Sequence, residues 1–349
     1  MGKWIGRSML VAIAMVAMAG GAQAQKSTLD AVKDRGKLRC SAHNGSFPAF
    51  FEVDGTGRWQ GFDIDFCKAV ATAILGAPDK VEYVPLSWAQ RFPSLQSGDI
   101  DVLFKQTAMT FSRDTKLGLQ FSVPYFFGGF QFMARAKSNI QAPKDLEGAT
   151  VCTAAGTSIE PMLVDFMAAH KVKFQLVTYE KTEELQSAYF AERCDAVAGY
   201  GPSLAVTRAL KVKDPSEHVL LPFALGVESQ NAAIRENDKR FLNVVNWTIL
   251  ALIKAETLGI DSKNIDSKRA ELSAKPDANL EAARLLGVKP GIGAPLGLPE
   301  TWAYATIKAV GNYGEIYDRN IGSASPYKLD RGFNRLWMNG GLIYSPAFD

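Results

Sequence analysis

Apolar residues in the first part of the chain follow two alternating periods, which predict helices separated by strands. They recur at helical spacing from Asp63 to Leu75 and from Gln90 to Ser97, and a glycine follows each stretch. Short runs predict three strands around these helices, at Lys37–Ala42, Lys80–Pro85 and Asp101–Lys105. Strand–helix–strand repetition with short connections predicts a mostly parallel sheet flanked by helices, hence an α/β fold.

A second series of the same kind begins near Pro143. Its expected strands are Ala149–Thr153, Phe174–Tyr179 and Cys194–Ala198. Its expected helices are Ile159–Ala169, Thr182–Ala191 and a third that Gly201-Pro202-Ser203 opens and that runs to Ala209.

Two extended runs join the two series. They are Phe127–Arg135 and Val219–Phe223, and the second leads into Gln230–Arg235. Two crossovers between two α/β units predict hinged lobes with a ligand cleft between them. We expect lobe 1 to comprise residues 25–133 and 230–349, and lobe 2 residues 134–229. The tail from Asn279, helical from Pro299 to Arg319, is expected to wrap lobe 1.

The N-terminus is typical of a secretory signal peptide over residues 1–24. Lys3 and Arg7 are followed by the apolar run Met9–Ala19 and by the small-residue ending Ala22-Gln23-Ala24. The apolar run is shorter than the ~20 residues that a membrane-spanning helix needs. We therefore expect cleavage after Ala24 and export of the mature protein.

Composition and charge narrow the class of partner. The chain has 349 residues, 47% hydrophobic and 21% charged, which is consistent with two globular domains of about 100–200 residues each. Its 39 basic and 36 acidic residues give a net charge of +3, and removal of two lysine or arginine residues with the signal leaves +1. The basic residues are dispersed among acids, so we do not expect nucleic-acid binding.

Four cysteines remain in the mature chain, and export makes disulfides plausible. Four cysteines allow three connectivities. We favour one disulfide within each lobe, Cys40–Cys67 and Cys152–Cys194. The three histidines, His43, His170 and His218, do not stand at metal-ligand spacing from another ligand, so neither a metal nor a cofactor is expected.

Two segments after predicted strands are candidates for carboxylate binding. Arg113, in Thr107–Asp114, offers a planar fork of donors that can hold a carboxylate at two points. The simpler reading is a surface arginine paired with Asp114. Gly156-Thr157-Ser158 opens a helix, where free N–H groups and the helix dipole favour an anion. Here the simpler reading is a cap in which Thr157 or Ser158 satisfies its own helix.

Aromatic side chains could line the lobe 1 side of a cleft. Phe47, Phe50, Phe51 and Trp88 are the candidates, and Phe47 and Phe50 lie in a loop after the first strand. Most aromatic residues pack in cores, which is the alternative for each of them.

These segments together resemble the polar and general amino-acid solute-binding proteins of bacterial ABC importers, and most closely their general L-amino-acid binding subgroup. The resemblance covers essentially the whole mature chain. The segments that carry it are Trp59–Val70, Arg91–Val102, Thr110–Asp114, Gly148–Cys152, Arg193–Asp195, Trp302–Tyr304 and Lys308–Tyr317. It implies the two-lobed periplasmic binding protein type II fold, a periplasmic location, a monomer, and an ABC permease in the inner membrane as partner.

The resemblance also implies site residues. The family's arginine at Arg113 grips the ligand's α-carboxylate, amides at 156–158 assist, and a hydroxyl like that of Thr107 contacts the amino group. This sequence departs from the family at Tyr200, where members carry an aspartate that holds the ligand's ammonium. A phenol has no negative charge at neutral pH. Lys105, Gln106 and Met109 are further departures within the same pattern.

We therefore hypothesise a ligand that is a modified amino acid or a carboxylate without a free α-ammonium, unless Glu160 or Asp195 compensates. The leading function is capture of an amino acid or related small carboxylate for import. One alternative is a fold-related enzyme, such as a dehydratase acting on a cyclic carboxylate, for which His43, Glu160 and Lys105 are the candidate acids or bases. The other is a ligand sensor that docks on a chemoreceptor. We expect no catalytic residue, because no nucleophile–base pair is visible.

Overall fold

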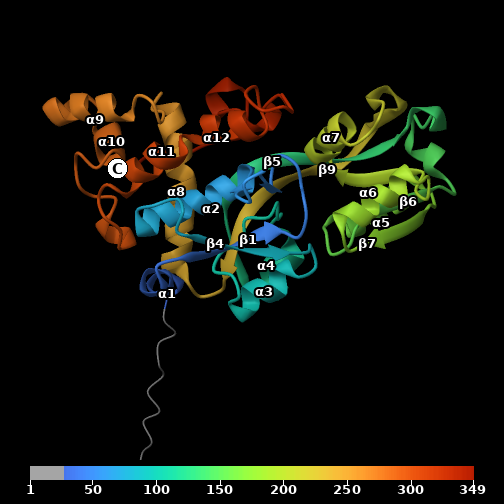
Figure 1. The fold of residues 1–349 in the computed structure, drawn as a ribbon, viewed down its shortest axis with the longest axis horizontal. Coiled ribbons are helices and arrows are strands. Elements are labelled where there is room, and N and C mark those ends of the chain that lie inside the picture. Colours follow the sequence, from blue (N-terminus) through green and yellow to red (C-terminus); the bar gives the residue numbers. More distant parts are fainter. Residues whose placement is uncertain (1–26) are drawn as a thin grey trace, which may run out of the picture.

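The computed structural model describes residues 27–349, so the predicted signal peptide lies outside the described residues. Figure 1 shows a larger and a smaller body joined by two long neighbouring strands, β5 (Leu119–Arg135) and β9 (His218–Arg235). These strands pair antiparallel along most of their length. The lobe boundaries expected from the sequence, near 133 and 230, fall inside these two strands.

The larger body, lobe 1, is built on a short parallel ladder between β1 (Leu38–His43) and β4 (Val81–Leu86). The prediction of a continuous third strand at Asp101–Lys105 is wrong. Val102 bridges Cys40 of β1 and Leu103 bridges Ala233 of β9. The segment changes partner between two consecutive residues, so neither ladder can extend.

Helices cover this ladder, and lobe 1 also contains a small antiparallel pair of strands, β2 with β3. The remaining elements of lobe 1 before the tail are α1 (Thr28–Arg35), β2 (Glu52–Val53), β3 (Trp59–Gln60), α2 (Phe62–Leu75), α3 (Arg91–Ser97), α4 (Phe111–Lys116) and α8 (Lys239–Thr257). Within residues 27–349, no helix combines the length and the apolar character needed to cross a membrane.

The smaller body, lobe 2, is a five-stranded sheet in the order β7-β6-β8-β5-β9. The β6 strand is parallel to β7 and β8, whereas β5 is antiparallel to β8 and β9. The sheet is therefore mixed rather than mostly parallel, because both crossover strands run through it. Its other elements are β6 (Thr150–Ala154), α5 (Ile159–His170), β7 (Gln175–Tyr179), α6 (Thr182–Phe190), β8 (Ala196–Tyr200) and α7 (Gly201–Leu210).

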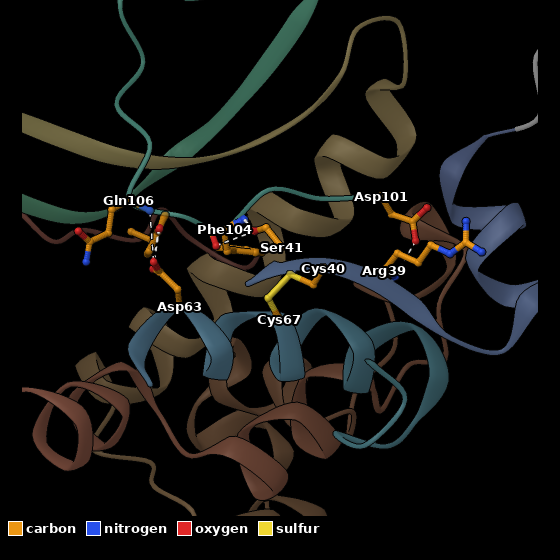
Figure 2. Close-up of a disulfide and its surroundings, with 9 residues drawn as sticks. Arg39, Cys40, Ser41, Asp63, Cys67, Asp101, Phe104 and Gln106 are labelled. Carbon is orange, nitrogen blue, oxygen red and sulfur yellow. Dashed lines mark hydrogen bonds between the residues drawn. A yellow bond between two sulfur atoms is a disulfide. The ribbon is translucent and has the colours of Figure 1, made fainter. Parts of the chain in front are cut away.

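Each lobe contains one disulfide, in the connectivity favoured from the sequence. Cys40 of β1 is bonded to Cys67 of α2, with Cα atoms 6.1 Å apart, and Figure 2 shows this bond tying strand to helix. Cys152 of β6 is bonded to Cys194, just before β8, with Cα atoms 5.8 Å apart. The two bonds each close a loop within one lobe and leave the hinge strands free.

The C-terminal tail is helical but is divided where the sequence predicted one helix, Pro299–Arg319. Helix α9 (Ile265–Ala274) precedes the tail, and the helices of the tail are α10 (Leu280–Leu285), α11 (Trp302–Val310) and α12 (Tyr313–Asn320). Gly311 ends α11 with φ +81°, and Asn312 caps α12 by accepting a bond from Glu315 N at 2.9 Å. The Glu315 carboxylate accepts from Asn312 N at 2.8 Å in return. This capping box starts a new helix and breaks the predicted one.

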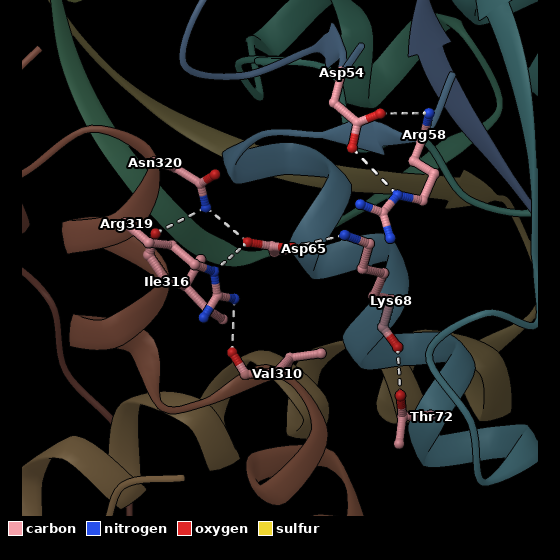
Figure 3. A network of polar contacts seen from close by, with 9 residues as sticks. All are labelled: Asp54, Arg58, Asp65, Lys68, Thr72, Val310, Ile316, Arg319 and Asn320. Carbon is pink, nitrogen blue, oxygen red and sulfur yellow. Dashed lines mark hydrogen bonds and ion pairs between the residues drawn. The ribbon is translucent and has the colours of Figure 1, made fainter. Parts of the chain in front are cut away.

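A polar cluster fastens the tail to lobe 1, as Figure 3 shows. Asp65 of α2 accepts hydrogen bonds from Arg319 Nε at 2.8 Å and from Asn320 Nδ2 at 2.7 Å. Lys68 Nζ approaches the other oxygen of the same carboxylate at 3.3 Å. The tail therefore packs on lobe 1, as expected from the sequence.

Candidate ligand site

A cavity lies between the two lobes, and residues of both lobes line it. Lobe 1 contributes Phe47, Trp88, Arg91, Gln106 and Arg113. Lobe 2 contributes polar residues that include Thr157, Ser158, Tyr200 and Ser203, and an apolar group around α6 and α7.

The lobes touch directly at the rim of this cavity. His43 Nε2 lies 3.1 Å from Thr182 Oγ1 at the start of α6, and Ser46 N donates to Glu183 Oε1 at 3.2 Å. Gly156 approaches so closely that an added Cβ would lie 3.0 Å from the Cα of Ala89. Each contact joins a residue of lobe 1 to a residue of lobe 2, so together they describe a closed arrangement of the lobes.

Arg113 is buried in the cavity wall, with 9% of its surface exposed. Thr110 Oγ1 accepts a bond from Arg113 N at 3.3 Å at the start of α4, and Arg113 Nη1 donates to Ala108 O at 2.9 Å. Burial lowers the pKa of Arg113, and the charge of Glu228 opposes this. A guanidinium remains charged at neutral pH, so the lowered pKa indicates a buried cation that an anion would stabilise. The alternative of an exposed arginine paired with Asp114 is wrong.

The start of α5 faces the same space. Thr157 Oγ1 donates to Ala154 O at 2.9 Å, and Ser158 Oγ donates to Glu228 Oε2 at 2.9 Å. Neither side chain caps α5, so the plain-cap alternative is wrong. The helix dipole and the N–H groups of the first turn are therefore directed at the cavity without a side-chain cap.

Glu228 is a carboxylate close to Arg113 and to the start of α5, and it was not selected from the sequence. It lies on β9 and is half-buried. Burial raises the pKa of Glu228, while the bond from Ser158 and the charge of Arg113 lower it. An acidic residue between the two predicted extended runs Val219–Phe223 and Gln230–Arg235 was the signal available in the sequence.

Tyr200 ends β8 at the cavity wall, with 6% of its surface exposed. Its ring packs against Phe50, Phe126 and Phe130 at centroid distances of 5.7–6.0 Å. Its hydroxyl has no hydrogen-bond partner among residues 27–349. Burial raises the pKa of Tyr200 well above its ordinary value, so the phenol remains neutral.

Of the nine candidate ligand contacts, the structure brings six to the cavity: Phe47, Trp88, Arg113, Thr157, Ser158 and Tyr200. Phe50, Thr107 and Lys105 are fully buried behind its wall instead. Phe50 packs on Tyr200, and Thr107 Oγ1 donates to Lys105 O at 2.8 Å. Their placement on the cavity surface was therefore wrong, since neighbouring residues enclose each side chain completely.

Lys105 and His43 form a buried pair just behind the aromatic wall. Lys105 Nζ contacts His43 Nδ1 and lies 4.4 Å from the centroid of Trp88. An ammonium can only donate, so Nδ1 accepts and the Nε2–H of His43 faces Thr182. Burial, and then the charge of Lys105, lower the pKa of His43 from 6.5 to about 2.

This pair leads to a pH-dependent prediction. The folded protein keeps His43 neutral, whereas the unfolded chain binds a proton near the ordinary pKa, so acidification favours unfolding. Between about pH 7 and pH 5 the parent should lose about 2 kcal/mol more unfolding free energy than His43→Gln. Urea denaturation at both pH values measures the difference. An equal loss in the two proteins would contradict the neutral assignment.

Two further polar residues of the wall were not selected as ligand contacts from the sequence. Arg91, at the start of α3, is only 2% exposed, and Gln106 has a left-handed φ of +37°. Asp63 holds Gln106 in place by accepting its backbone N–H at 3.2 Å, as Figure 2 shows, and also accepts from Tyr125 Oη at 2.7 Å. A basic residue in the first turn of a helix, where the dipole disfavours it, was the sequence signal for Arg91.

The described residues contain no cluster of three or more His, Cys, Asp or Glu side chains that could hold a metal ion. Hinged α/β lobes that close over a cavity with a buried guanidinium and a helix N-terminus define a two-lobed solute-binding protein. Residues 38–263 match the bacterial extracellular solute-binding proteins, family 3, and the chain belongs to that family. The resemblance seen in the sequence, with its type II fold, is thereby confirmed.

Relatives match along nearly the whole chain. The chain is 39% identical to the putative amino-acid ABC transporter-binding protein YhdW of Escherichia coli K12, over 97% of this chain and 96% of that protein. It is 40% identical to the general L-amino acid-binding periplasmic protein AapJ of Rhizobium johnstonii, over 95% and 96%. A periplasmic binding protein of Brucella ovis, solved with glutathione bound, superposes with a TM-score of 0.86 at 41% identity, over 92% of this chain and 99% of that one.

Proposed function

We propose that this chain is the periplasmic solute-binding component of an ABC importer and captures an amino acid or a related small carboxylate. The observation that supports this proposal most strongly is the position of Arg113. It lies buried in the interlobe cavity, opposite the start of α5, where the N-cap residue makes no side-chain cap. The name of YhdW, an amino-acid ABC transporter-binding protein, and that of AapJ, a periplasmic protein that binds L-amino acids, support this proposal.

In the proposed mechanism, Arg113 and the first turn of α5 hold the ligand's carboxylate from opposite lobes. Phe47 and Trp88 form the aromatic wall, and Ser158 and Tyr200 complete the polar contacts. The ligand therefore stabilises closure across β5 and β9, a hinge motion of the kind that other two-lobed binding proteins use. The closed monomer is then presented to a permease in the inner membrane and releases its ligand unchanged, without catalysis.

Ligand recovery tests this proposal. Protein purified from its own host and denatured should release a stoichiometric small carboxylate that mass spectrometry identifies. The same compound, incubated with fresh protein, should raise the melting temperature and be recovered chemically unchanged. Conversion into a product would indicate an enzyme, and a recovered compound without any carboxylate would contradict the assigned chemistry.

A further inference from the structure

The cavity contains a second buried guanidinium beside the first. Arg91 and Arg113 lie against the same ring, with their Cζ atoms 4.5 Å and 5.1 Å from the centroid of Phe92. Arg91 Nη1 donates to Trp88 O, but its Nε has no partner within the described part of the chain. Burial, and then the charge of Arg113, lower the pKa of Arg91. Two neighbouring cations with low solvation favour an anion between or beside them.

The other unsatisfied polar groups of the wall fit an anion. Gln106 Nε2, Tyr200 Oη and Ser203 Oγ are buried without partners among residues 27–349, and all three side chains can donate. None of the described residues that line this cavity is acidic. Two carboxylates lie close to the cavity without lining it: Glu228 accepts from Ser158 Oγ at 2.9 Å, and Glu160 accepts from Gly156 N at 2.6 Å. A ligand ammonium would therefore meet two positive charges and no lining counter-charge.

The lobe 2 end of the cavity is apolar. Side chains from β5, α6, β8 and α7 enclose it, namely Met133, Leu185, Tyr189, Val197 and Leu204. These residues belong to a separate hydrophobic cluster of lobe 2. An apolar substituent of the ligand would lose contact with water against these side chains.

We infer that the ligand is an organic anion with a net negative charge and an apolar group, rather than a zwitterion with a neutral side chain. This inference rests on the proposed function and specifies its ligand class. Arg113 and Arg91 face the acidic part, and the apolar group occupies the recess between α6 and α7.

Calorimetry with three matched probes tests it. L-Leucine and N-acetyl-L-leucine share one apolar group and one carboxylate, but only L-leucine has an ammonium, while N-acetyl-L-leucine methyl ester has neither charge. We expect N-acetyl-L-leucine to bind at least about tenfold more tightly than L-leucine, and the ester to give no heat. Equal or tighter binding of L-leucine, or no binding of N-acetyl-L-leucine at millimolar concentration, would overturn the inference. Neither result would contradict the proposed function, which ligand recovery from the host tests separately.

Glu228→Gln is an independent test, because the negative charge of the Glu228 carboxylate repels an anionic ligand. Removal of that charge should strengthen binding of N-acetyl-L-leucine by about threefold or more, since the repulsion is relieved. Glu271→Gln, which removes the same charge from exposed α9, is the matched control and should leave binding unchanged. Weaker binding in Glu228→Gln, or equal strengthening in both variants, would contradict the anionic class.

Discussion

Replacement of Arg113 by alanine is expected to weaken ligand binding by about 2–5 kcal/mol, because the carboxylate loses its buried charged partner. This corresponds to a loss of about thirtyfold to several thousandfold in affinity. Calorimetry with the carboxylate recovered from the parent protein measures the loss. Among all single changes considered, this one should have the largest effect.

Arg113→Lys is the matched control, because it keeps the charge and removes the planar fork. Lysine cannot hold a carboxylate at two points, so this variant should bind between the alanine variant and the parent. Melting temperatures without ligand show whether either change alters folding, since Arg113 also donates to Ala108 O. If the alanine variant bound the ligand with the affinity of the parent, Arg113 would not be part of the binding site.

Gly156→Ala is expected to weaken binding by preventing full closure. The new Cβ would lie 3.0 Å from the Cα and 3.3 Å from the Cβ of Ala89 in the opposite lobe. Overpacking of this kind costs about 1–3 kcal/mol, or about fivefold to 150-fold in affinity, and acts only in the closed state. Calorimetry with the same ligand measures it.

Gly148→Ala is a close control within the same lobe. Gly148 has φ +73° and Gly156 has φ +71°, so alanine in this left-handed conformation costs about 1–2 kcal/mol of stability at either position. A Cβ at Gly148 meets nothing within 4 Å. Both variants should therefore be less stable, but only Gly156→Ala should lose affinity. Equal affinities would show that the lobes do not close against Ala89 when the ligand binds.

Local patterns predicted most of the fold. Apolar spacing and terminal glycines place α2 at Phe62–Leu75 and α3 at Arg91–Ser97, each within one residue of the expected start. The prediction failed where tertiary partners decide, as at Leu103, which pairs with Ala233 far along the chain. The break at Gly311 was missed although the signal is local, since glycine followed by Asn312 and Glu315 marks one helix end and the next cap.

The site was predictable where one residue type fixes the chemistry. Arg113 and the start of α5 could be selected because a guanidinium and a helix N-terminus bind carboxylates wherever they face a cavity. Lys105 and Thr107 were misplaced because the sequence does not show which side of a short irregular segment faces the cleft. Arg91 and Glu228 were missed because their roles depend on neighbours from other elements, Arg113 in the case of Arg91 and Ser158 in the case of Glu228.

The central claim is that one buried guanidinium in lobe 1 receives an anion that lobe 2 then covers. A crystal structure with the recovered ligand tests this most directly. The account predicts carboxylate oxygens about 2.7–2.9 Å from the Arg113 guanidinium nitrogens, with the opposite side of the ligand covered by the first turn of α5. A ligand seated elsewhere, or one that turns an uncharged end toward Arg113, would contradict it.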